Sequence, residues 1–191
     1  MRAKAPMTPP ADDASPAVRA YFEWQHLKQL YRQGWLRRGI SEAHCESVAD
    51  HVLGTALLCM QLADAHHPAL DGERVLRLAL IHDLGEAHAG DLTPADGVSD
   101  ADKHDRERAA VLRITEGVPG AESWLALWDE YESQETPEAH FVRQVDKLEM
   151  ALQAAVYQRQ GRADLREFFR SARAAIEDPA MLAILDEIEG R

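Results

Sequence analysis

Apolar residues recur along most of this chain at intervals of three or four, the spacing that places them on one face of an α-helix. The clearest such stripe consists of Val48, Val52, Leu57, Leu58 and Leu62. No segment shows the sustained alternation of β-branched and polar residues that is typical of a strand. The pattern therefore predicts an all-α protein.

Capping and turn residues divide this pattern into helices. The first helix is predicted from Ser15-Pro16, a cap followed by a proline in the first turn, to Gln33, where Gly34 ends it. The second is predicted over about Ser47 to His66 and the third over about Glu73 to Ala87. The remaining helices are predicted over about 100–116, 121–132, 137–160, 163–177 and 179–189, with a loop at 90–97. Residues 1–14, rich in prolines and small residues, are predicted to be a disordered segment before a single domain at 15–191.

Charge and composition restrict the classes of partner. The chain carries 33 acidic against 21 basic residues, a net charge of −12, and an acidic surface repels polyanions. A nucleic-acid polymer is therefore not expected as a partner. The apolar runs fall far short of the ~20 residues that a membrane span needs, and the N-terminus lacks the apolar core of a signal peptide. Cys45 and Cys59 are too few for a disulfide framework, which favours a cytoplasmic location without membrane association.

One window of the chain departs from this acidic balance. Between Trp24 and Ser41 there is no acidic residue, and the window holds four cations, Lys28, Arg32, Arg37 and Arg38. Such a run is compatible with a solvated helix end. It is equally compatible with a local binding site for a small anion, and the charge pattern alone leaves both interpretations open.

The candidate chemistry is concentrated in Ile81-His82-Asp83-Leu84-Gly85-Glu86, which follows an apolar run. On a continuous helix Glu86 would lie on the same face as His82 and Asp83. Burying such groups without hydrogen-bond partners costs roughly several kcal/mol of folding free energy. Two further candidates, His51 and Asp146, lie on other predicted helices. Taken singly, each is more typical of a hydrogen-bonded core histidine or a solvent-facing aspartate. Together, two histidines and two aspartates are a typical ligand set for one divalent metal that activates water.

The pattern His51 … His82-Asp83 … Asp146 resembles the H…HD…D signature of the HD-domain metal-dependent phosphohydrolases. Four segments are similar to the branch that holds the bacterial 5′-deoxynucleotidases and the eukaryotic HD domain-containing protein 2. These segments are Glu46–His51, Leu80–Glu86, Gly90–Asp96 and Gln144–Glu149. The resemblance extends over about Tyr21 to Tyr157.

The resemblance implies an HD-domain helical bundle with its metal site between the central helices. It implies one divalent cation, Co²⁺, Mn²⁺, Mg²⁺ or Zn²⁺, and four ligands, His51, His82, Asp83 and Asp146. Glu86 would orient or deprotonate the attacking water, and Asp91 would stand near the ribose and the leaving oxygen. Members of the family hydrolyse deoxyribonucleoside 5′-monophosphates and are commonly homodimers.

The resemblance also gives the acid-free window a role. Arg32, Arg37 or Arg38 would clamp the phosphate oxygens, and Trp35 would form a wall of the pocket. The chain departs from the family pattern here: Arg37-Arg38-Gly39-Ile40 stands where relatives have an Arg-Asn pair, and the segment before His51 is about two residues longer. The choice among the arginines stays open, with Arg32 favoured by its position relative to Trp35.

The expected function is that of a metal-dependent phosphomonoesterase acting on (deoxy)ribonucleoside 5′-monophosphates, a small-molecule substrate. One alternative is an HD-domain hydrolase of another small phosphate ester or signalling nucleotide. Another is a non-catalytic interaction protein in which the metal only joins three helices. Glu86 favours an enzyme, because a structural metal site needs no carboxylate to activate water.

Overall fold

The computed structural model describes residues 2–190, except for the side chain of Pro94. The helices in chain order are α1 (Pro16–Trp24), η1 (Gln25–Lys28), α2 (Gln33–Arg37), α3 (Val48–His66), α4 (Gly72–Ile81), α5 (Glu86–Ala89), η2 (Pro94–Asp96), α6 (Asp100–Ile114), α7 (Glu122–Ser133), α8 (Pro137–Arg159), α9 (Arg166–Ala175) and α10 (Pro179–Glu189). Within residues 2–190, extended pairing is limited to two isolated bridges, Ala3 with Leu30 and Tyr31 with Ser47. The prediction of an all-α protein is confirmed.

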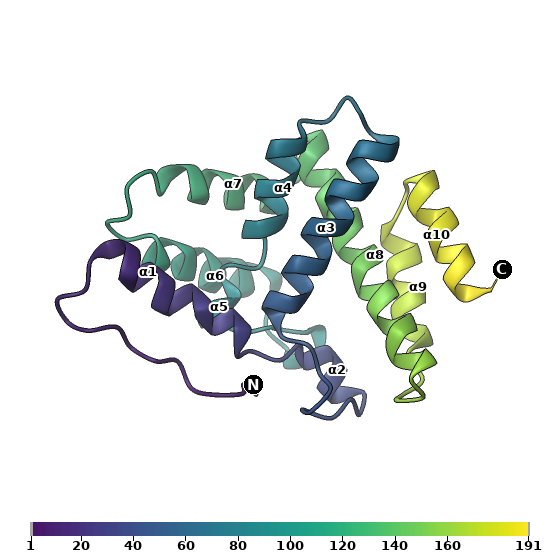
Figure 1. Ribbon diagram of the computed structural model, residues 1–191, viewed down its shortest axis with the longest axis horizontal. Helices are drawn as coiled ribbons and strands as arrows, with labels where there is room; N and C mark the ends of the chain where they lie inside the picture. Colours follow the sequence, from purple (N-terminus) through teal and green to yellow (C-terminus); the bar gives the residue numbers. More distant parts are fainter. Residues whose placement is uncertain (1, 191) are drawn as a thin grey trace.

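The long helices α3 and α8 cross the middle of the molecule, and α4 packs against both (Figure 1). Helices α9 and α10 cover α8 on one side, while α1, α5, α6 and α7 lie on the other. Two groups of buried apolar side chains hold this arrangement together. One contains the C-terminal half of α3 with α8, α9 and α10, and the other contains the start of α3 with α1, α5 and α6. The two groups therefore meet along α3 between Val52 and Ala56.

The central helices begin where their capping residues predict. The side-chain oxygen of Ser47 accepts a hydrogen bond from the backbone N–H of Asp50, and the Asp50 carboxylate accepts from the Ser47 N–H at 2.8 Å. At the start of α8 the Thr136 hydroxyl oxygen accepts a hydrogen bond from Ala139 N–H, and Pro137 lies in the first turn. The predictions for these two helices are confirmed, and the helices after residue 100 agree with prediction to within three residues at each end.

The predicted first helix is wrong in its second half. Helix α1 begins at Pro16 as expected but ends at Trp24, and Gly34 lies inside α2 instead of ending a helix. The reason is pairing with the segment before α3. The Leu30 carbonyl accepts from Val48 N–H at 3.0 Å, and Arg32 N–H donates to the Glu46 carbonyl at 3.1 Å. A helix through Gln33 would instead direct the Arg32 N–H to the carbonyl of Lys28.

The predicted third helix is also interrupted. Helix α4 ends at Ile81, residues 82–85 form turns, and a new short helix starts at Glu86. Helix α6 passes this turn so closely that a Cβ on Gly85 would lie 2.7 Å from the Glu107 carbonyl oxygen. The local hydrogen bonds span three residues, as from Glu86 N–H to the Asp83 carbonyl at 3.1 Å. The candidate metal-binding dipeptide therefore lies on a turn, not within a helix.

The segment before α1 contacts the bundle at its start. Lys4 N–H donates to the Gln29 carbonyl at 2.7 Å, and the Gln33 side chain hydrogen-bonds both backbone groups of Arg2. The disorder of residues 1–14 and the single domain at 15–191 stay predictions. Among the helices of residues 2–190, none combines the length and the apolar character needed to cross a membrane.

Candidate metal centre

His51 lies on the inward face of α3, within the buried stripe of Val48, Val52 and Thr55. The spacing of this stripe turns the imidazole toward α4 and α8, and the residue is only 1% exposed. Asp146 occupies the corresponding buried face of α8, next to Val145. Both side chains therefore reach the same interior space from two helices that pack against each other.

The turn after α4 supplies the other two candidate ligands. His82 Nε2 lies 3.3 Å from Asp83 Oδ2, and His51 Nε2 lies 3.7 Å from the same oxygen. His51 Nε2 is also 3.1 Å from Asp146 Oδ1. The structure thus brings together all four residues that the sequence singled out. One donor atom each from His51, His82 and Asp83 lies within 4.8 Å of the others, close enough for one ion.

The two imidazole rings are held in the same tautomer. His82 Nδ1 lies 2.7 Å from the carbonyl oxygen of Ala79, and His51 Nδ1 lies 2.5 Å from Glu149 Oε2. A carbonyl oxygen and an ionised carboxylate can only accept, so both Nδ1 atoms carry the proton. In its neutral form each ring therefore presents the lone pair of Nε2 to Asp83, which is the form in which histidine binds a metal.

Four buried polar atoms of this cluster lack a hydrogen-bond partner among the described residues. They are Nε2 of His51, Nε2 of His82, Oδ2 of Asp83 and Oε2 of Glu86. A buried polar atom without a partner costs about 1–3 kcal/mol. A divalent cation would satisfy the two nitrogens and the Asp83 oxygen together, and a mixed nitrogen and oxygen set suits such an ion. The residues present therefore fit a divalent metal.

Electrostatics support the same conclusion. Burial lowers the pKa of His51, but the carboxylates of Asp146 and Glu149 outweigh it and raise that pKa to about 10. Burial opposes the ionisation of Asp146, yet Lys147 and His51 hold its pKa well below the ordinary value. The interior around His51 therefore favours a positive charge.

Glu86 behaves in the opposite way. Glu86 is only 4% exposed. Burial, together with the charges of Asp83 and Asp91, raises the pKa of its carboxyl group well above the ordinary value. The carboxyl group therefore retains a proton more readily than an exposed glutamate does. Such a group is suited to accept and return protons near neutral pH once a nearby cation offsets part of this shift.

Of the three candidate phosphate-binding arginines, the structure brings Arg32 to the cluster. Its Nη1 donates to Asp91 Oδ1 at 2.8 Å and lies 3.7 Å from Asp83 Oδ2. The other Asp91 oxygen accepts from the backbone N–H of Gln33. The Arg32 and Asp91 side chains are only 16% and 8% exposed. Asp91 therefore fixes the guanidinium beside the candidate metal ligands.

The structure does not bring Arg37 or Arg38 to the cluster. Arg37 pairs with Asp96, and Arg38 pairs with Glu167 at the protein surface. The Trp35 ring is 2% exposed and packs in the core against the rings of Phe168 and Tyr157, with centroids 4.3 and 5.5 Å away. Its role as a wall of the substrate pocket stays a prediction.

Glu149 is a residue of this site that sequence reasoning did not single out. It follows Asp146 by three residues on α8, a spacing that places both carboxylates on one helix face. That spacing was a usable signal. The spacing does not show that Glu149 contacts Nδ1 of His51, because these two residues are 98 positions apart.

Comparisons with known proteins agree with this geometry. A model of the HD domain family matches residues 24–186. The chain is 38% identical to 5′-deoxynucleotidase HDDC2 of Danio rerio over 168 residues, which cover 85% of this chain and 80% of that protein. A solved protein of Pyrococcus horikoshii OT3 superposes with a TM-score of 0.74 at 33% identity, covering 90% of this chain and 97% of that one.

A second solved structure carries a functional description. It is named as a predicted metal-dependent phosphohydrolase from Magnetospirillum magnetotacticum MS-1, with a TM-score of 0.69 and 27% identity over 91% of each chain. The family match covers most of the chain, and the four segments of the H…HD…D pattern lie within it. This chain belongs to the HD domain family.

Proposed function

We propose that this protein is a metal-dependent phosphomonoesterase that hydrolyses deoxyribonucleoside 5′-monophosphates to the nucleoside and phosphate. The observation that carries the proposal is a buried set of partnerless donor atoms from His51, His82 and Asp83 beside a buried, fixed Arg32. Relatives named as 5′-deoxynucleotidases support the substrate class, and they are 34–38% identical to this chain over 85% of its length.

Four residues would hold the metal, His51, His82, Asp83 and Asp146, and the ion would be Co²⁺, Mn²⁺, Mg²⁺ or Zn²⁺. When bound, such an ion neutralises phosphoryl charge and lowers the pKa of a coordinated water. The nitrogen donors favour the transition metals among these ions over Mg²⁺, which prefers oxygen ligands.

The remaining roles fall to three residues. Arg32 would neutralise non-bridging phosphate oxygens, because phosphoryl transfer needs charge stabilisation more than covalent help. Glu86, buried and with Oε2 free of hydrogen bonds, would orient the attacking water and hold its proton. Asp91 would stand near the ribose and the leaving oxygen, and its contact with Arg32 at 2.8 Å would also keep the guanidinium in place.

Phosphate release from dAMP and dCMP tests this proposal. We expect Mn²⁺- or Co²⁺-dependent turnover that a chelator abolishes and Asp83→Ala eliminates. Asp164→Ala is the matched control, because Asp164 is an exposed aspartate paired with Arg166 outside the cluster. Full activity of Asp83→Ala or of chelated enzyme would contradict the proposal. Turnover of another phosphate ester in a substrate panel, with no turnover of nucleotides, would support the second hydrolase class instead.

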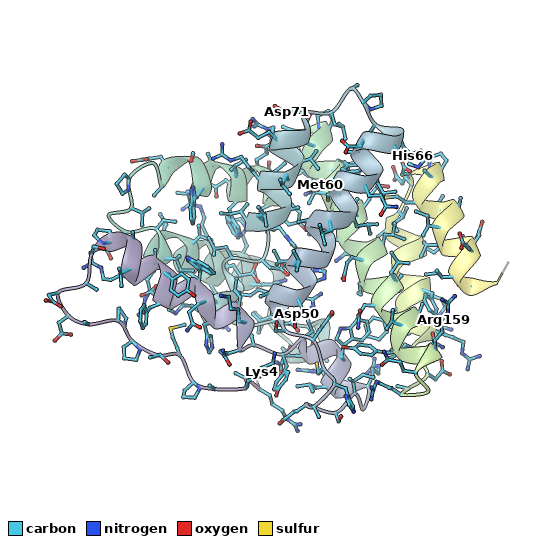
Figure 2. All side chains as sticks on the ribbon, viewed as in Figure 1. Lys4, Asp50, Met60, His66, Asp71 and Arg159 are labelled. Atoms are coloured by element: carbon cyan, nitrogen blue, oxygen red, sulfur yellow. The ribbon has the colours of Figure 1, made fainter. Side chains whose placement is uncertain are left out.

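We also propose that the protein acts as a homodimer in the cytoplasm. Leu53, Leu57 and Met60 are 58%, 58% and 46% exposed and follow one face of α3. Figure 2 labels Asp50 and Met60, which mark the two ends of this face. Cys45 and Cys59 are free, buried thiols, as expected in a reducing compartment. Light scattering of the purified protein measures the assembly directly.

A further inference from the structure

The far side of the His51 ring contacts a carboxylate that the proposed reaction does not use. Glu149 Oε2 on α8 lies 2.5 Å from His51 Nδ1 on α3, and the two side chains are 12% and 1% exposed. This is the closest contact that His51 makes with any of its neighbouring carboxylates. The ring is therefore held between Glu149 on one side and Asp83 with Asp146 on the other.

The chain makes room for this carboxylate with a glycine. A Cβ on Gly54 would lie 2.6 Å from Glu149 Oε1 and 3.2 Å from its Cδ. Gly54 is inside α3, one turn after His51, where a glycine costs about 0.5–1 kcal/mol relative to alanine. A helix that carries this cost at the one point where Glu149 enters is consistent with a requirement for that contact.

The two histidines differ in what holds them. His82 Nδ1 faces a neutral backbone carbonyl, that of Ala79, whereas His51 Nδ1 faces a carboxylate. A carboxylate partner fixes the ring orientation and makes the opposite nitrogen a stronger electron donor toward a metal. His51 should therefore depend on its partner more than His82 does.

We propose that Glu149 is a positioning residue of the metal centre. It holds His51 with the proton on Nδ1 and Nε2 directed at the ion, and Gly54 provides the space for it. The inference rests on the proposed metal site but adds residues that contact neither the ion nor the substrate.

A neighbouring carboxylate provides a matched control. Glu46 lines the same open pocket as Gly54 and Glu149, and its donor atom lies within 4.8 Å of those of His51 and Glu149. Its carboxylate, however, accepts from Trp35 Nε1 at 2.7 Å. Glu46→Gln therefore removes a negative charge from the same surroundings without removing the hydrogen bond to His51.

The experiment measures Mn²⁺ affinity, by the electron paramagnetic resonance signal of the free ion, for the wild-type protein and four variants. We expect Glu149→Gln to weaken binding about 10-fold or more. Gly54→Ala should give a comparable loss even though alanine is the better helix former, and combining it with Glu149→Gln should add little. Glu46→Gln should have a much smaller effect. Far-UV circular dichroism confirms that each variant is folded.

A spectroscopic measurement separates positioning from general destabilisation. In the Zn²⁺-loaded protein labelled with ¹⁵N-histidine, the His51 Nδ1–H proton should be at low field and protected from exchange. Glu149→Gln should shift it and speed its exchange, while the His82 signal stays unchanged. Wild-type affinity in Glu149→Gln would overturn the inference, and so would equal losses in Glu46→Gln and Glu149→Gln. A wild-type protein that binds no Mn²⁺ would overturn the metal centre itself, which phosphate release tests separately.

Discussion

At the scale of single residues, three arginines of one acid-free window end in three different surroundings. Arg32 is buried beside Asp83 and Asp91, whereas Arg37 and Arg38 form surface ion pairs with Asp96 and Glu167. The sequence could place cations near each other but not distinguish them, because Glu167 is 129 positions from Arg38. We therefore propose that the anion site expected in this window depends on Arg32 alone.

The first prediction follows from this difference. Arg32→Ala should lower kcat/KM for dAMP about 100-fold or more, because it removes a fixed donor aimed at developing charge. Arg32→Lys should recover only part of the loss, since an ammonium lacks the planar fork of the guanidinium. Arg37→Ala and Arg38→Ala should each stay within about twofold of wild type. Steady-state kinetics decide it, and equal losses in all three alanine variants would refute the assignment.

A second residue-scale prediction concerns Glu107, which is buried beside the turn at Gly85. Burial raises the pKa of Glu107 to about 7, although Lys103, 3.5 Å away, opposes the shift. Between the ordinary pKa of 4.5 and about 7 the folded state binds more protons than the unfolded state, so stability falls as pH rises. Glu107→Gln cannot ionise and should remove up to about 3 kcal/mol of this loss by pH 8.

Urea unfolding in EDTA at pH 4.5 and pH 8 measures this effect. The advantage of Glu107→Gln over wild type should grow with pH. Glu116→Gln is the control, because Glu116 is exposed just beyond the end of the same helix. A constant difference between Glu107→Gln and wild type at both pH values would contradict the prediction.

At the scale of helices, capping residues predicted well where the helices begin. The hydrophobic pattern did not show where tertiary contacts break a helix. Ser47 and Thr136 mark the starts of α3 and α8 by local hydrogen bonds, and local bonds are what a sequence encodes directly. The breaks after Trp24 and Ile81 depend on backbone pairing with residues 46–48 and on the approach of α6. The four candidate ligands could be proposed from residue type and family resemblance, but the position of His82 and Asp83 on a turn could not be predicted.

The close approach of α6 gives a prediction for Gly85. Alanine at this position would place a Cβ 2.7 Å from the backbone oxygen of Glu107, and backbone cannot move aside as a side-chain end can. We expect Gly85→Ala to destabilise the protein by about 1–3 kcal/mol and to displace Asp83 from the cluster. Gly72→Ala is the control, since nothing lies within 4 Å of its added Cβ. The melting temperature and the Mn²⁺ affinity should both decrease in Gly85→Ala and stay unchanged in Gly72→Ala.

At the scale of the whole molecule, the proposed metal connects segments that are far apart in sequence. Its candidate ligands come from α3, from the turn after α4 and from α8, near the junction of the two apolar groups of the core. An ion that binds only the folded chain adds about 2.7 kcal/mol of stability when its free concentration is 100 times the dissociation constant. For a chain of this length that corresponds to a melting temperature about 5–10 °C higher.

Removal of the metal should therefore lower the melting temperature by about that amount. Scanning calorimetry with Mn²⁺ and then with excess EDTA measures it in wild type and in Asp83→Asn. The variant should melt at the same temperature in both conditions, because a neutral amide replaces the carboxylate whose oxygen lies 3.3 Å from His82 Nε2 and 3.7 Å from His51 Nε2. An equal Mn²⁺-dependent rise in both proteins would mean that the ion stabilises the fold at another place.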